Sequence, residues 1–357
     1  MIAEIRLKNF RSYSEKLFNL SPGLNLVVGP NASGKTNLLE AVMVVCVGNS
    51  YRAPDVELIK HNHSWSRIEA NTEDNLRLVK ISHDALKTNK EFIIKEKTYK
   101  RLSLNHQLPI VLFEPNHLLM LTGAPERRRA YLDGLLDQIT VGYKKTRNDY
   151  LRTLRQRNAL LKLPNLTSEQ IFPWNVKLSQ LGGYIATART HLINELNSTI
   201  NETYLRVVGS ADKLNLAYLP SVDIDSYESR LFKKLEATIE LDCLRGVTSE
   251  GPHREDFQIN INSKPVAYTA SRGETRSIAI TLKSIEADIL TDKLKSEPII
   301  LMDDVFSELD SKRTSQLGLF FKHRQSLVTT TDATKRRLFK SGAQIINTAV
   351  VNLGAEK

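Results

Sequence analysis

The chain has 357 residues, of which 41% are hydrophobic and 25% are charged, and its formal net charge is +10 at pH 7. This composition is ordinary for a globular protein and excludes a disordered or fibrous chain. The length is enough for two or three domains. The positive charge favours an acidic partner, of which nucleic acid is the commonest.

Neither secretion nor membrane insertion is expected. Residues 1–6 carry charge where a signal peptide needs an apolar core. The longest apolar run, residues 41–47, is far shorter than the roughly 20 residues that span a bilayer. The two cysteines, Cys46 and Cys243, lie among apolar residues and are too few for a disulfide framework. We therefore expect a soluble, cytoplasmic protein without a membrane segment.

The N-terminal segment contains a phosphate-binding loop in its expected context. An apolar run at residues 24–28 predicts a strand, and apolar residues at helical spacing over 37–47 predict a helix. Between them, residues 29–36 read GPNASGKT and fit the pattern G-x-x-x-x-G-K-[ST]. Lys35 would reach the β- and γ-phosphates of ATP, and Thr36 would ligate Mg²⁺. The residues expected to bind ATP are Gly29, Pro30, Asn31, Ala32, Ser33, Gly34, Lys35, Thr36 and Asn37.

The middle of the chain, from residue 116 to about 241, has a mainly helical pattern. It shows no sustained heptads, so we expect no long coiled-coil arm. The three expected segments are therefore 1–115, an N-terminal part with the P-loop, 116–241, a helical insertion, and 242–357, a C-terminal part that returns to an α/β pattern.

Part of the helical segment is strongly basic. Residues 127–157 hold nine basic and three acidic residues, and such a surface could neutralise DNA phosphates without reading sequence. A charge run is as often a solvated helix face, and residues 127–129 could instead brace two lobes. The DNA-binding candidates are Arg127, Arg128, Arg129, Lys144, Lys145, Arg152, Arg155 and Arg157.

The C-terminal segment supplies acidic residues for the same site. Apolar residues 299–302 predict a buried strand that ends at Asp303 and Asp304, in the position where ligands bind in open α/β sheets. Asp303 would hold Mg²⁺, and Asp304 would orient the attacking water, so Asp304 and Lys35 are the catalytic candidates.

A second phosphate contact is expected at the start of the helix that precedes this strand. Ser271 and the backbone of Gly273, which Glu274 follows, stand where a helix N-terminus could bind a γ-phosphate. Serine at a helix start is also a common N-cap, and both interpretations stay open.

Together these motifs resemble the RecF family of the SMC-like ABC ATPase group over nearly the whole chain. The segments that carry the resemblance are residues 7–13 (LKNFRSY), 29–41 (GPNASGKTNLLEA), 115–133 (PNHLLMLTGAPERRRAYLD), 251–256 (GPHRED) and 301–313 (LMDDVFSELDSKR). The chain departs from the family at Asn116, where an acid is usual, and at Arg272 and Thr275, where the ABC signature has glutamines.

The resemblance implies an α/β fold, namely an ABC-type P-loop ATPase head with an inserted, mainly α-helical lobe. It implies a homodimer that forms on ATP, with Ser271, Gly273 and Glu274 contacting the nucleotide of the other subunit. It also places Arg11 at the nucleotide and Ser307 and Asp310 in a D-loop.

The function implied is ATP-dependent DNA binding in recombinational repair, with slow, DNA-stimulated hydrolysis. The protein would help to load RecA at single-strand gaps together with RecO and RecR. The alternatives are a nucleotide-binding subunit of an ABC transporter, which needs a membrane partner, and an SMC-like clamp, which needs long heptad arms.

Overall fold

The computed structural model describes residues 1–73, 75–84, 86–304, 324–331 and 344–348. Their contacts divide the chain into two compact units, residues 1–115 with 286–357, and residues 116–285. The second boundary differs from the expected one near residue 241. The reason is that β9 (Leu214–Leu219) pairs antiparallel with β10 (Asp256–Ile261) and so holds both sides of residue 241 in one unit.

The first unit contains a six-stranded antiparallel sheet in the order β2-β1-β4-β5-β6-β7. In β1 the apolar Ile5 and Leu7 are fully buried, whereas the intervening Arg6 and Lys8 are partly exposed. This alternation gives the sheet one core face and one polar face. Its strands are β1 (Ile2–Phe10), β2 (Tyr13–Asn19), β4 (Trp65–Thr72), β5 (Leu76–His83), β6 (Thr88–Ile94) and β7 (Lys97–Tyr99).

A second sheet of this unit is parallel throughout, in the order β14-β3-β13-β12-β8. Every residue of β3, β8, β12 and β13 is buried, as expected for strands that are covered on both faces, whereas the edge strand β14 is partly exposed. They are β3 (Leu24–Val28), β8 (Ile110–Phe113), β12 (Ile299–Met302), β13 (Ser326–Thr330) and β14 (Gln344–Asn347).

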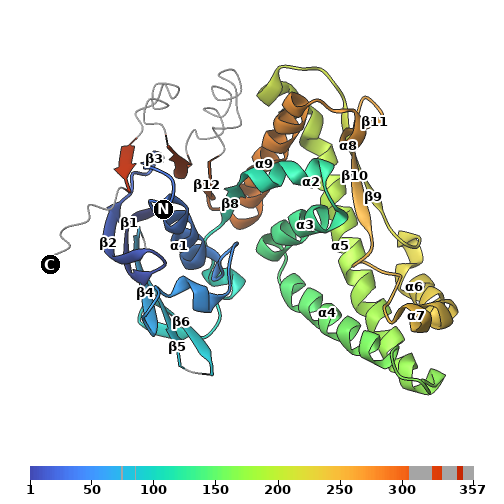
Figure 1. Ribbon diagram of the computed structural model, residues 1–357. Helices are drawn as coiled ribbons and strands as arrows, with labels where there is room; N and C mark the ends of the chain where they lie inside the picture. The colour runs from blue at the N-terminus through green and yellow to red at the C-terminus, as the bar shows by residue number, and fades with distance from the viewer. Residues whose placement is uncertain (74, 85, 305–323, 332–343, 349–357) are drawn as a thin grey trace. The chain divides into compact units, whose positions relative to one another are not determined.

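Helix α1 (Lys35–Val47) contacts strands of both sheets, and its residues form one hydrophobic core with them (Figure 1). Because the five strands are parallel, the carboxyl ends of β3 and β12 lie at the same edge, with β13 between them. That edge carries both the P-loop and the acidic pair. Two short 3₁₀ turns complete the described part of this unit, η1 (Asp55–Leu58) and η2 (Leu104–His106).

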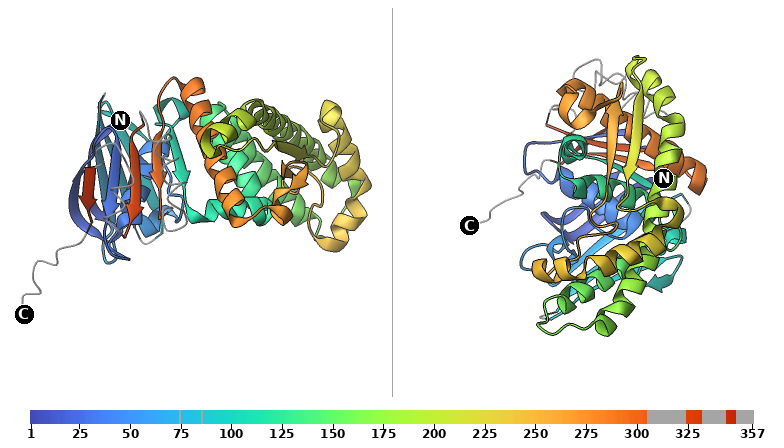
Figure 2. Two further views of the ribbon diagram at one scale, coloured as in Figure 1. Left: turned by 90° about the horizontal axis from the view of Figure 1, so that it is seen from above. Right: turned by 90° about the vertical axis from the view of Figure 1, so that its right-hand side faces the viewer.

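The second unit is built around α5 (Ser168–Val208), a helix of 41 residues. It packs against α4 (Tyr143–Leu160), α6 (Tyr227–Ala237) and β9 rather than projecting as an arm. Figure 2 shows β9 and β10 side by side in its right-hand view. The remaining elements are η3 (Pro115–His117), α2 (Leu118–Thr122), α3 (Pro125–Ile139), η4 (Ile224–Ser226), α7 (Ile239–Arg245), β11 (Lys264–Pro265), α8 (Val266–Thr269) and α9 (Arg272–Leu294), within which the unit boundary falls.

Within the described residues, no helix combines the length and the apolar character that crossing a membrane requires.

Candidate functional site

The loop between β3 and α1 has the backbone that a P-loop requires. Gly34 precedes α1 with φ +92°, and a Cβ there would lie 2.6 Å from the Tyr13 hydroxyl. A Cβ on Gly29 would lie 2.4 Å from the Ser33 Oγ. Only glycine fits both positions without displacing neighbours. No described side chain caps α1, so its first N–H groups and its positive end are available to an anion.

Lys35 lies over this loop. Its Nζ donates to the carbonyl oxygens of Gly29 and Pro30, each at 2.7 Å. Burial lowers the pKa of Lys35, and the nearby carboxylates of Asp304 and Asp303 oppose that effect. Its hydrogen bonds to two neutral carbonyls can be exchanged for bonds to phosphate oxygens, which also pair with its charge.

Asp303 follows β12 and meets the P-loop threonine across the sheet edge. Its Oδ1 accepts from the Thr36 hydroxyl at 2.9 Å and from the Thr329 hydroxyl at 2.9 Å. The Tyr51 hydroxyl lies 3.4 Å from its Oδ2. A hydroxyl and a carboxylate this close are hard oxygen donors of the kind that bind Mg²⁺ together with phosphate oxygens and water, so the residues fit that ion.

Asp304 is held in an uncommon backbone conformation, with φ +49°. Its N–H donates to the Thr329 Oγ1 at 2.8 Å, so one buried threonine fixes both acidic residues. Thr329 and Tyr51 were not among the residues predicted from the sequence. Two threonines at the carboxyl end of a fully buried strand, as in β13, are the signal that could have found Thr329.

Arg11 contacts α1 through a carboxylate. Its Nε and Nη2 donate to the two carboxylate oxygens of the fully buried Glu40 at 2.8 and 2.7 Å. The hydrogen bonds to Glu40 are the main reason that the pKa of Arg11 is raised. Beside this pair, Asn37 donates to the Ser12 hydroxyl at 2.9 Å. A cavity of about 600 Å³ opens here, lined by Arg11, Ser12, Asn37, Glu57, His61 and His63 among others.

Ser271, for which the sequence predicted a second phosphate contact, caps a helix. Ser271 N–H donates to the Glu274 carboxylate at 2.7 Å, and Glu274 N–H donates to the Ser271 Oγ at 3.2 Å. This reciprocal pair is a capping box at the start of α9. Gly273 lies in the first turn of the same helix. Ser307 and Asp310, expected in the D-loop, lie outside the described residues.

Comparison with known proteins decides the family. The family model described as RecF/RecN/SMC N terminal domain matches residues 1–354. The DNA replication and repair protein RecF of Chlamydia abortus is 35% identical over 92% of this chain and 91% of its own length. That of Bacillus cytotoxicus is 31% identical over 92% and 91%. The chain belongs to the RecF family of SMC-like ABC ATPases.

Solved RecF structures share the whole fold. One described as the recombination mediator protein RecF-ATPrS in the RecFOR pathway matches with a TM-score of 0.86 and 27% identity, over 98% of this chain and 96% of that one. The RecF-ATP structure matches with a TM-score of 0.82 and 27% identity, over 93% and 92%. An Smc head bound to the C-winged helix domain of ScpA, at 14% identity and a TM-score of 0.53, shares the fold alone. The fold is thus an ABC-type P-loop ATPase head with a helical insertion.

The basic residues predicted to contact DNA in this RecF-family chain are either engaged within the protein or exposed. Arg157 is fully buried and pairs with Asp242 at 2.8 Å, so it is removed from the set. Arg128 forms a two-fold pair with Asp256 at 2.7 and 2.6 Å, and Arg129 donates to the Glu255 carbonyl at 2.7 Å. Both arginines therefore hold α3 against the start of β10 and the residue before it. The exposed candidates are Arg127, Lys144, Lys145, Arg152 and Arg155.

The segment 251–256, which carries part of the family resemblance, forms a buried polar network. The Tyr150 hydroxyl lies 2.7 Å from His253 Nδ1, and Nε2 lies 3.1 Å from the Thr248 carbonyl. These partners fit a neutral ring that accepts at Nδ1 and donates at Nε2. Burial lowers the pKa of His253 to about 4. This geometry indicates a structural role for His253 in the turn before β10.

Proposed function

We propose that this protein binds ATP with Mg²⁺, dimerises on it, and acts on DNA in recombinational repair, helping RecO and RecR to load RecA at single-strand gaps. The observation that carries the proposal is the hydrogen bond between Thr36 and Asp303, which joins opposite ends of the chain beside Lys35. The RecF relatives and the RecF structures with bound ATP support the same function.

ATP binding would use three parts of the first unit. The N–H groups at the start of α1 would receive the phosphates, and Lys35 would leave its two carbonyl partners for the β- and γ-phosphate oxygens. Thr36 and Asp303 would hold Mg²⁺, which neutralises phosphate charge. The cavity beside Asn37 and Arg11 is large enough for the nucleoside half.

Hydrolysis would depend on Asp304. Its position after Asp303 places it where a carboxylate can orient water toward the γ-phosphate. Aspartate is one methylene shorter than the glutamate common at this position, and this favours slow turnover. Slow hydrolysis suits a protein whose ATP-bound dimer is the active form.

Dimerisation would complete the site with the start of α9 from a second subunit. The capping box leaves the Ser271 hydroxyl at the N-terminal end of a 23-residue helix, where an anion is favoured. DNA would then meet exposed cations of α4. Lys145, Arg152 and Arg155 recur at i, i+7 and i+10 and share one face of that helix.

The test is a calorimetric ATP titration, combined with sedimentation and DNA binding with and without ATP. Lys35→Ala is expected to lose tight ATP binding, ATP-induced dimers and the ATP-dependent part of DNA binding. Lys97→Ala, an exposed lysine of β7, is the matched control and should behave as wild type. Unchanged ATP affinity in Lys35→Ala would refute the site, and ATP-induced dimers that ignore DNA would favour the transporter-type alternative.

A further inference from the structure

The polar face of the six-stranded sheet carries a row of cations. In the strand registers, Lys8 of β1 lies opposite Arg67 of β4, and Arg67 lies opposite Lys80 of β5. Lys80 in turn lies opposite Glu91 of β6. Three cations therefore stand side by side across three neighbouring strands, on the face that points away from the core.

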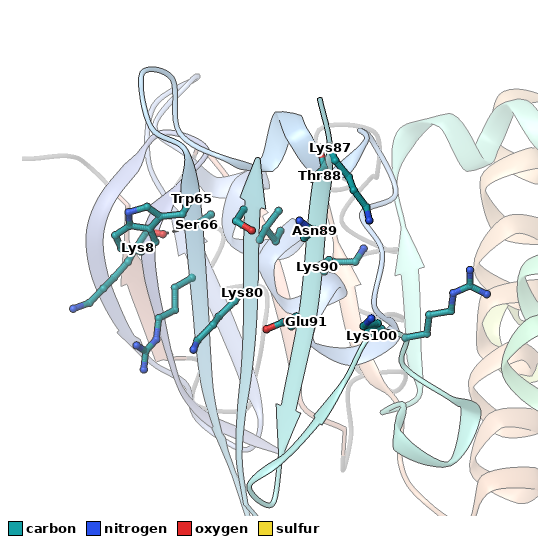
Figure 3. Close-up of a pocket in the computed structure, with 14 residues that line it drawn as sticks. Lys8, Trp65, Ser66, Lys80, Lys87, Thr88, Asn89, Lys90, Glu91 and Lys100 are labelled. Atoms are coloured by element: carbon teal, nitrogen blue, oxygen red, sulfur yellow. Dashed lines mark hydrogen bonds between the residues drawn. The ribbon is translucent and has the colours of Figure 1, made fainter. Parts of the chain in front are cut away.

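This row lines a groove of about 940 Å³ that also includes Trp65 (Figure 3). Of the fourteen described residues that line it, seven are Lys or Arg and one, Glu91, is acidic. Trp65 is 45% exposed, although tryptophan usually buries most of its surface. The groove therefore combines repeated positive charge with an accessible flat ring.

The protein itself satisfies only part of these charges. Lys8 pairs with Glu15 at 3.1 Å and Arg67 with Glu69 at 2.5 Å, both at the surface. Among the described residues, no ion pair is formed by the other exposed cations of the groove, which are Lys80, Lys87, Lys100 and Arg101. Like charges directly opposite one another destabilise a sheet, so a ligand with repeated negative charge explains this row better than folding does.

We propose that this groove binds a single strand of DNA, with phosphates on the row Lys8, Arg67 and Lys80 and a base stacked on Trp65. Stacking on an aromatic platform inside a cationic groove is how proteins bind single strands without sequence preference. A duplex keeps its bases stacked on each other and offers Trp65 no free base face. The inference rests on the proposed function for the choice of DNA as the polymer.

Lys90 also lines the groove, but its ammonium is engaged by other residues. Its ammonium pairs with Asp55 at 2.6 Å and lies 5.8 Å from the Phe92 ring centre. It therefore belongs to the packing of the sheet rather than to the proposed contact.

The decisive experiment uses tryptophan fluorescence of the full chain. The chain has two tryptophans, so in a Trp174→Phe background Trp65 is the only emitter. Titration with an oligothymidine of about 20 nucleotides, longer than the roughly 4–16 that single OB-fold modules cover, should quench Trp65. The same amount of duplex should leave it largely unquenched. Trp65→Ala, in the Trp174-containing protein, should weaken single-strand binding about tenfold or more, whereas Trp65→Phe, which keeps a ring, should weaken it less.

The cation row is tested by salt dependence. Arg67→Ser with Lys80→Ser should lower the slope of log K against log salt by about 1.4, since each lost phosphate contact on a single strand contributes about 0.7. The control, Lys97→Ser with Lys264→Ser, removes two exposed strand lysines outside the groove and should leave the slope unchanged.

The outcomes separate this inference from the proposed function. Calorimetric ATP binding should be unchanged in every groove variant. If the chain binds DNA while Trp65 stays unquenched, or if single strand and duplex lose affinity equally in Trp65→Ala, the groove proposal is overturned alone. If the chain binds neither DNA form with or without ATP, both proposals fail.

Discussion

Replacing Arg157 by leucine should destabilise the protein strongly. The guanidinium is fully buried and ties α4 to three other parts of the second unit. Its Nε donates to Asn175 at 2.7 Å, and its Nη1 donates to Asp242 and to Thr248, each at 2.8 Å. Asp242, also fully buried, would lose its ion-pair partner.

The magnitude follows from breaking this buried ion pair. Removing one member of a buried ion pair costs about 3–5 kcal/mol, a large share of the roughly 5–15 kcal/mol that stabilises a typical protein. Arg155→Leu is the matched control because Arg155 is exposed on the same helix, and such surface changes stay within about 0.5 kcal/mol.

Urea unfolding followed by far-UV circular dichroism measures the difference, and DNA binding is measured on the same samples. Arg157→Leu with Asp242→Leu should recover part of the loss, because the two residues are directly coupled. If Arg157→Leu is as stable as Arg155→Leu and has lost DNA affinity, then the arginine contacts DNA and its burial is refuted.

Three further changes probe other parts of the chain. Asp304→Asn should keep ATP and Mg²⁺ binding but suppress hydrolysis, because an amide cannot take a proton from water; phosphate release near the wild-type rate would argue against this role. Ser271→Arg should bind ATP yet fail to dimerise on it in sedimentation, whereas Ser271→Ala, which loses the helix cap at about 1 kcal/mol, should still dimerise. If both variants dimerise, Ser271 is only a cap. His253 has a pKa lowered from 6.5 to about 4, so the unfolded state binds more protons between these values. Stability should therefore fall by up to about 3 kcal/mol as the pH drops from 6.5 toward 4, and His253→Asn should lose most of this dependence in urea midpoints measured against pH.

The backbone geometry of the predicted nucleotide site is specified by local signals in the sequence. The P-loop glycines are needed for backbone positions that a short motif specifies, as the φ of Gly34 shows. Asp303 could be placed beside Thr36 without coordinates, since parallel strands bring their carboxyl ends to one edge. Thr329 was missed because its role depends on tertiary contacts. Its hydroxyl bridges Asp303 and Asp304, which follow the neighbouring strand β12.

Features that depend on distant partners were harder to predict. Residues 214–219 read LNLAYL, an alternation typical of a strand, within a segment assigned as helical. Their pairing partner, β10, begins at Asp256. The observed boundary between the units, after residue 285, differs from the predicted one after residue 241 for the same reason. No local pattern indicates which later segment completes a sheet.

Charge counting failed at Arg157, and the helix period explains why. Tyr150, Leu154 and Arg157 stand at i, i+4 and i+7 of α4, and all three are buried. An arginine at the same helical spacing as a buried apolar stripe lies on the core side of the helix, whatever the local charge density. Arg152 and Arg155 lie off that stripe and are exposed. The same rule applied to strands selects Lys8, Arg67 and Lys80, which alternate with buried residues and so must face outward together. The position of each cation within the helix or strand period therefore indicates a nucleic-acid surface better than the number of cations does. In this chain these positions point to the six-stranded sheet as well as to α4.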